Sequence, residues 1–152
     1  MYLFYLGNMM LPVTPEKLEL KIANNNKTIT LINDGEVNLL KRPGLTKVKF
    51  GALLPNIKYP FAVYSNGFQP AEVYLNKLES LKVSQAPFVF RVMRSREDAF
   101  SSFDTFLTVS LEEYTITEDA EKYGRDVYVS ISLLQYQGCV TKTITFQDSP
   151  SA

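Results

Sequence analysis

The sequence predicts an α+β fold, a mainly antiparallel β-sandwich or small barrel with one flanking helix. Three observations predict the α+β class. Apolar and polar residues alternate with a period of two along most of the 152 residues, one segment has helical periodicity, and turn residues separate the runs. Because no internal repeat or long linker divides the chain, residues 1–146 are predicted to form one domain and residues 147–152 a frayed tail.

The first third of the chain shows the pattern of antiparallel hairpins. Residues 2–6 and 9–13 are predicted to pair across a two-residue turn at Gly7-Asn8. After that hairpin, Asn24-Asn25-Asn26 and Asp34-Gly35 mark further turns, and Pro43-Gly44 marks a break. The strands expected between these signals are residues 18–22, 29–31, 36–40 and 48–54.

Residues 71–83 form the one clear helix, because apolar residues recur there at three- and four-residue spacing. Pro70 suits a first helical turn, and Pro87 enforces the end. An irregular Pro- and aromatic-rich connection, residues 53–67, precedes the helix and is expected to pack on the domain. The strands predicted after the helix are residues 88–94, 103–116, 126–136 and 140–146.

The strand at 103–116 requires a bulge. Leu107, Val109 and Leu111 have one parity whereas Tyr114 and Ile116 have the other, so a bulge or bend near Glu112-Glu113 is needed to keep both sets inward.

Composition excludes most familiar catalytic sites. The chain has no histidine, so nucleophiles activated by histidine and histidine-containing zinc sites are unavailable. Cys139 is alone and is expected to pack as a small apolar residue. The net charge is zero, which argues against non-specific binding of nucleic acid, and no segment resembles a signal peptide or a membrane span. We therefore predict a protein that is not an enzyme and holds no cofactor and no metal.

Three groups of residues are candidates for binding or catalysis. An acidic cluster around Glu112 and Asp126 could serve glycoside hydrolysis or calcium, but a solvated turn accounts for it more simply. Lys47 and Lys49 alternate with apolar residues, as expected for the solvent-exposed face of a half-buried strand. The 10 Phe and 9 Tyr favour core packing and a protein interface, with binding of a cell-wall glycan or another small ligand as the alternative.

Several linked strings between residues 2 and 136 carry a resemblance to a known family: Tyr5-Leu-Gly-Asn8, Leu11-Pro-Val-Thr-Pro-Glu-Lys17, residues 25–38, Lys41-Arg-Pro-Gly-Leu45, Leu53-Leu-Pro-Asn56, Tyr59-Pro-Phe-Ala62 and residues 109–121. Together they resemble the N-terminal domain of LysM-containing baseplate proteins from contractile tails of Gram-positive prophages and phage-tail-like particles, of the PBSX-like type, and this resemblance implies a tail-tube-like fold. The sequence contains no LysM module, so glycan binding is not carried over with the resemblance.

The resemblance implies a structural protein at the inner baseplate, near the junction of tail tube and hub. It implies a homo-oligomeric ring, with six copies as one option, and contacts with tube and hub proteins. It further implies that the protein resides in the virion or tail-like particle after assembly in the bacterial cytoplasm. We expect no nucleic-acid partner and no membrane insertion. The candidate interface residues are Tyr2, Phe4, Tyr59, Phe61, Glu112, Glu113, Glu118 and Asp119.

The net charge is zero because a positively charged segment and a negatively charged segment cancel. Residues 1–60 hold eight basic and four acidic side chains, whereas residues 91–126 hold five and nine. A positive flank of one copy could therefore meet a negative flank of the next in a ring of identical subunits.

Overall fold

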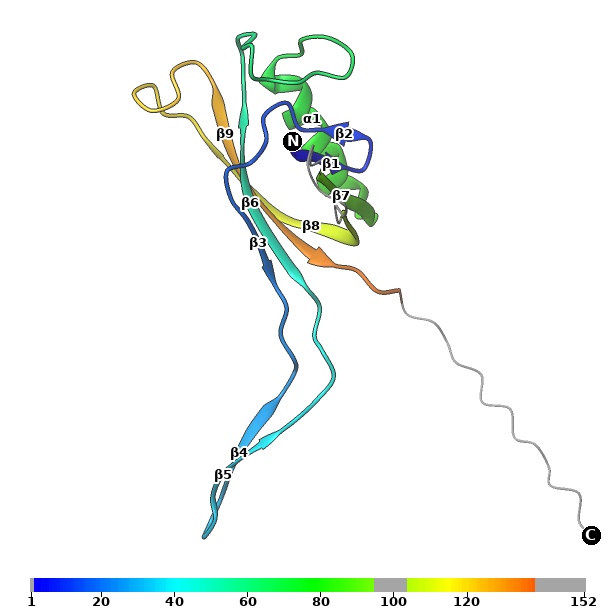
Figure 1. Ribbon diagram of the computed structural model, residues 1–152, viewed down its shortest axis with the longest axis vertical. Coiled ribbons are helices and arrows are strands. Elements are labelled where there is room, and N and C mark those ends of the chain that lie inside the picture. Colours follow the sequence, from blue (N-terminus) through cyan, green and yellow to red (C-terminus); the bar gives the residue numbers. More distant parts are fainter. Residues whose placement is uncertain (1, 95–103, 139–152) are drawn as a thin grey trace, which may run out of the picture.

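The structure is a computed structural model that describes residues 2–94 and 104–138 (Figure 1). Cys139 and the strand predicted at 140–146 lie outside the described residues. In chain order the elements are β1 (Tyr2–Leu6), β2 (Met9–Met10), β3 (Leu18–Lys21), β4 (Lys27–Leu31), β5 (Gly35–Leu39), β6 (Lys47–Leu54), α1 (Ala71–Ser84), β7 (Phe88–Arg94), β8 (Thr105–Thr117) and β9 (Val127–Gln135).

Seven of these strands form one antiparallel sheet in the order β2-β1-β7-β8-β9-β6-β3, and β4 and β5 form a separate two-stranded sheet. The predicted fold class, a mainly antiparallel sheet with a single helix, is confirmed. In Figure 1, β3, β6 and β9 run together on one side of the body, and β1, β2, β7 and α1 gather on the other.

The large sheet curls over its own core. Three strands separate β1 from β6 in the sheet, yet the rings of Phe4 on β1 and Phe50 on β6 lie 5.8 Å apart. Phe90 on β7 stacks on Phe50 at 5.6 Å, so the three rings fill the space inside the curl. Alternate residues of β6 and β9 face this core, as their burial shows: Val48, Phe50, Ala52, Leu54, Val127, Val129, Ile131 and Leu133.

The predicted bulge is present in β8. Leu111 pairs with Leu133 and Glu113 pairs with Ser132, so Glu112 is the extra residue. The shift turns Tyr114 back toward the core, where it packs against the buried cluster, whereas Ile116, also predicted to face inward, is 46% exposed.

Helix α1 matches the predicted segment and extends one residue beyond it. Ala71, Tyr74 and Leu78 form its buried stripe. Pro70 offers no side-chain cap; instead the side-chain oxygen of Asn56 accepts a hydrogen bond from the amide of Ala71 at 3.0 Å. Gln85 ends the helix in a left-handed conformation with φ 53°. No helix in the described residues is long and apolar enough to cross a membrane.

The second strand is shorter than the predicted residues 9–13. Leu11 still donates its amide to Phe4, but Pro12 has no N–H to continue the ladder, and its carbonyl accepts from Val63 instead. The chain thus leaves β1 at Pro12 and contacts the connection before α1.

Candidate assembly surfaces

Residues 22–45 form a hairpin arm that projects from the body along the long axis of the molecule (Figure 1). Its two strands, β4 and β5, pair with each other across a turn in which Gly35 has φ 75°. From residue 22 to residue 43 every side chain is exposed except that of Ile29, which is half-buried. The arm therefore lacks a core of its own.

The arm is amphipathic. In register, Ile29 lies opposite Val37, so these two side chains share a face with Leu31 and Leu39, and Lys27, which pairs with Leu39, lies at the stem end of that face. The opposite face carries the pairs Thr28 with Asn38 and Thr30 with Glu36. One apolar and one polar face is the pattern of a sheet that covers a core on one side.

Hydrogen bonds order the stem of the arm where it leaves the body. The amide of Asn25 donates to Arg42 at 3.0 Å, and the amide of Gly44 donates to Ala23 at 2.7 Å. A Cβ atom at Gly44 would lie 2.7 Å from the side-chain oxygen of Asn25, so that side chain would have to move. These hydrogen bonds hold the two legs of the stem together.

Seven aliphatic side chains of the arm are exposed, and their exposed fractions add up to about four fully exposed side chains. At roughly 1.5–3 kcal/mol for each aliphatic side chain buried, covering all of them would supply on the order of 6–12 kcal/mol before the costs of association. An isolated two-stranded hairpin is at best marginally stable in water, so this arm is suited to packing on another surface. The seven are Ile22, Leu31, Ile32, Val37, Leu39, Leu40 and Leu45.

A second apolar surface lies on the outer side of strands β1, β7 and β8, and we call it the outer patch. Tyr5, Arg91 and Phe106 form one row across the three strands, because Tyr5 pairs with Arg91 and Arg91 with Phe106. The Arg91 guanidinium lies 4.3 Å from the centre of the Tyr5 ring and 6.0 Å from that of Phe106. Val89 and Met93, on the same side of β7, are 46% and 38% exposed, and Phe106 is 61% exposed.

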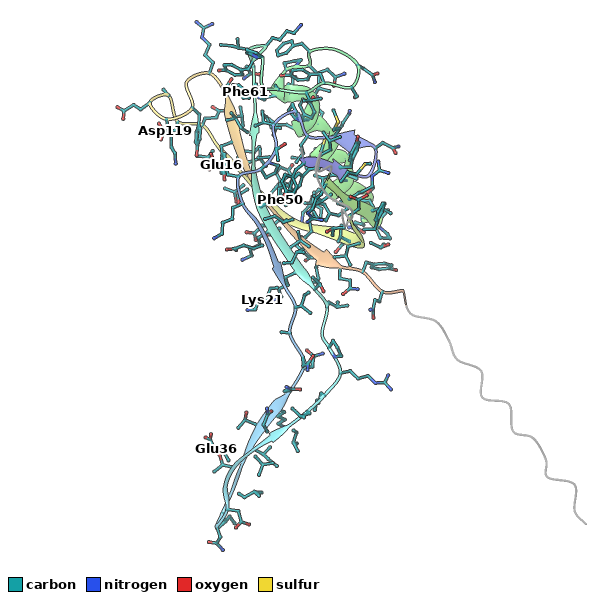
Figure 2. The ribbon with its side chains drawn as sticks, viewed as in Figure 1. Glu16, Lys21, Glu36, Phe50, Phe61 and Asp119 are labelled. Atoms are coloured by element: carbon teal, nitrogen blue, oxygen red, sulfur yellow. The ribbon has the colours of Figure 1, made fainter. Side chains whose placement is uncertain are left out.

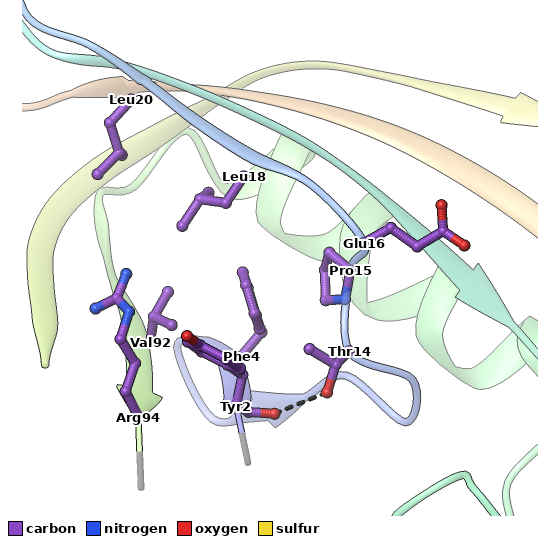
Figure 3. Close-up of a pocket in the computed structure, with 9 residues that line it drawn as sticks. All are labelled: Tyr2, Phe4, Thr14, Pro15, Glu16, Leu18, Leu20, Val92 and Arg94. Carbon is purple, nitrogen blue, oxygen red and sulfur yellow. Dashed lines mark hydrogen bonds between the residues drawn. The ribbon is translucent and has the colours of Figure 1, made fainter. Parts of the chain in front are cut away.

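The predicted interface residues Tyr2 and Phe4 line a groove of about 500 Å³ between β1, β7 and β3 (Figure 3). Tyr2 is 51% exposed, and its carbonyl accepts a hydrogen bond from the hydroxyl of Thr14 at 2.8 Å. Phe4 is only 4% exposed, because its even position on β1 points into the curl of the sheet. Phe4 is therefore corrected from an interface residue to a core residue.

Of the predicted pair Tyr59 and Phe61, Phe61 lies at the end of the body away from the arm (Figure 2). Their rings stack at 4.9 Å, and Phe61 is 62% exposed. The Tyr59 hydroxyl donates to Asp126 at 2.7 Å. This hydrogen bond, helped by partial burial and by the charge of Asp126, raises the pKa of Tyr59 above its ordinary value.

Asp126 organises this end of the body. It is the buried charged residue of the described chain, at 5% exposure, although it lies next to a loop of solvated acidic residues. Besides Tyr59, it accepts the amide of Asn56 at 3.0 Å, and the Asn56 side chain in turn donates to the Arg125 carbonyl and accepts from Ala71. The start of β9, the end of β6 and the start of α1 are thus joined through two side chains.

The four predicted acidic interface residues are exposed but lie in two different places. Glu112 and Glu113, at the bulge of β8, line a groove of about 320 Å³ with Lys47 and Lys49 of the same chain. The Lys82 ammonium donates to the carbonyl of Glu112, which ties α1 to the bulge. Glu118 and Asp119 belong to the loop after β8, at the end opposite the arm, where Figure 2 labels Asp119.

The loop after β8 is held by its own turn. The Asp119 carboxylate accepts the amides of Glu121 and Lys122 at 3.0 and 3.2 Å. Among the described residues, no group of three or more His, Cys, Asp or Glu side chains is placed to hold a metal ion. The acidic loop is thus a local turn in this structure.

Comparison with known proteins finds no matching family model. The uncharacterized protein YqbP of Bacillus subtilis (strain 168) is 26% identical over 129 residues, which are 85% of this chain. The chain spans 54% of the length of that relative.

Two solved structures share the fold. The sheath/tube terminator of PVC, an extracellular contractile injection system, in its extended state, aligns with a TM-score of 0.53 and 10% identity over 90% of this chain and 89% of that one. A chain of the PVC sheath–tube complex in the extended state aligns with a TM-score of 0.51 and 8% identity over 90% and 84%. The chain therefore has the fold of contractile injection system tail proteins.

Proposed function

We propose that the chain is a structural subunit of a contractile phage tail or tail-like particle. In this proposal it lies at the inner baseplate, near the tube–hub junction, and acts through contacts with copies of itself and with tube and hub proteins. The amphipathic arm carries the proposal, because its apolar face has no partner in the described part of the chain. The shared fold with the PVC tail proteins supports the same setting.

The exposed surfaces of the chain fit a structural role better than a catalytic one. The conspicuous solvent-facing features are apolar sheet faces, namely the arm and the outer patch, and such faces are used for protein contacts. Asp126, the one carboxylate buried among the described residues, is engaged by Asn56 and Tyr59 in joining three elements. We accordingly assign the chain no catalytic role.

A deletion of the gene tests the proposal. Particles from the deletion strain are expected to lack complete, correctly terminated tails in negative-stain micrographs, and the wild-type gene supplied in trans should restore them. The chain should also co-purify with intact particles. Normal, infectious tails in the deletion strain would disprove the proposal.

One observation favours a second candidate, a module that binds cell-wall glycan. A groove of about 570 Å³ runs between residues 13–17 and the loop after β8, and Phe61, Tyr123 and Tyr128 line it. Tyr123 and Tyr128 stack at 5.1 Å with their planes 2° apart, leaving a flat aromatic surface of the kind on which sugar rings stack. Sedimentation with purified peptidoglycan separates the candidates, because the structural role predicts no specific retention.

A further inference from the structure

We infer that the apolar face of the arm packs on the outer patch of a second copy of this chain. This inference rests on the proposed function and names the partner and the surface that the proposed subunit uses. It pairs two surfaces that the chain exposes: the arm face, built from Ile29, Leu31, Val37 and Leu39, and the patch around Arg91.

The two surfaces have compatible architecture and compatible residue types. Both are faces of antiparallel sheet, and two such faces pack about 10 Å apart with side chains interdigitating. The arm offers aliphatic side chains. The outer patch offers Tyr5, Phe106, Met93 and Arg91, which are the residue types enriched at the centres of protein interfaces.

The geometry favours a second copy over the same copy. The arm leaves the body from β3 and β6 and points away from β1, β7 and β8 along the long axis (Figure 1). The two strands that lead into the arm stay paired up to Lys21 and Lys47, so the arm continues from β3 and β6. The arm is therefore placed to reach a neighbouring molecule.

The arrangement is heterologous, because the arm of one copy contacts a different surface on the next. Each copy supplies one arm and one outer patch, so a closed ring satisfies both surfaces on every copy. The zero net charge of the chain avoids strong repulsion between identical subunits.

The size of the contact also favours a ring over a free dimer. Residues 22–32 reach roughly 35 Å at about 3.3 Å per residue. A two-stranded ribbon about 10 Å wide then covers roughly 350 Å², less than half of the about 800 Å² per partner in a standard stable interface. One such contact is too small to hold two free chains firmly, whereas a ring provides two contacts for each copy.

Cross-linking in cells that assemble particles tests the inference. The natural Cys139 is first replaced (Cys139→Ser), and two variants are co-expressed: Val37→Cys on the apolar face of the arm and Val89→Cys in the outer patch. A short bismaleimide is expected to give a covalent dimer in the mixture and to give none with either variant alone. The matched control, Asn38→Cys with Val89→Cys, places the thiol on the opposite face of the same arm and should lose the dimer.

Three results would overturn the inference: no dimer in the mixture, a dimer from Val37→Cys alone, or equal yields with the Asn38→Cys control. A dimer from Val37→Cys alone would mean that arms pair with arms. Purified particles are probed for the chain in parallel. Particles that contain the chain but give one of these cross-linking results contradict only this contact, whereas particles without the chain contradict the proposed function.

Discussion

The substitution Asp126→Ala isolates the residue that joins three elements at the end of the body away from the arm. Its carboxylate is 5% exposed and accepts the Asn56 amide at 3.0 Å. A hydrogen bond to a charged group contributes about 1.5–3 kcal/mol, and the unpartnered amide and the small cavity left by alanine add to the loss. We expect the free energy of unfolding to fall by about 2–4 kcal/mol, which lowers the melting temperature of a chain this size by roughly 5–15 °C.

Urea denaturation followed by circular dichroism measures this change. The matched control is Glu121→Ala, which removes an exposed carboxylate from the neighbouring loop and should change stability by less than about 0.5 kcal/mol. A double-mutant cycle with Tyr59→Phe should show coupling, because the Tyr59 hydroxyl donates directly to the Asp126 carboxylate at 2.7 Å. Equal losses for Asp126→Ala and Glu121→Ala would refute the assignment of Asp126 as an anchor.

Three further predictions concern other parts of the chain. The raised pKa of Tyr59 means that the folded state retains its proton more tightly, so stability should fall as pH rises above about 10, and Tyr59→Phe should reduce that fall in pH-dependent melts. Phe4→Ala should cost about 3–5 kcal/mol in urea denaturation, whereas Tyr2→Ala should cost under about 1; similar costs would contradict the core assignment. Val37→Asp should leave the melting temperature of the free chain unchanged and abolish incorporation into particles, while Asn38→Asp should be incorporated normally.

Local patterns in the sequence predicted most of the strands, the helix and the bulge. Period-two alternation fixes which side chains of a strand face inward, so the change of parity between Leu111 and Tyr114 was enough to place an extra residue at Glu112. Local patterns did not predict the order of the strands in the sheet. The pairing of β1 with β7 and of β6 with β9 joins segments far apart in sequence, and the compatible hydrophobic faces alone do not specify it.

The candidate surfaces were predicted less well, for physical reasons specific to each. Asp126 was grouped with the solvated acidic loop, because nothing local distinguishes a buried acceptor; its partners, Asn56 and Tyr59, come from a distant segment. Phe4 was misassigned because it shares its parity with Tyr2; only Tyr2, at the start of β1, is exposed, whereas Phe4, in the middle of the strand, is buried. The outer patch was missed although a signal existed: in β7, Val89 and Met93 are apolar at the positions opposite in parity to the core residues.

The salt dependence of cross-linking distinguishes an apolar contact between arm and outer patch from a contact between oppositely charged segments of two copies. Glu112 and Glu113 share a groove with Lys47 and Lys49 of their own chain, so part of the negative segment is compensated within each copy. Apolar contact between arm and outer patch should therefore persist in about 0.5 M NaCl, where the Debye length is only roughly 4 Å, and sulfate should strengthen it. The measurement is the yield of the Val37→Cys with Val89→Cys dimer at rising salt. If NaCl abolished that dimer and Glu118→Lys with Asp119→Lys did the same at low salt, charge rather than apolar burial would hold the copies together.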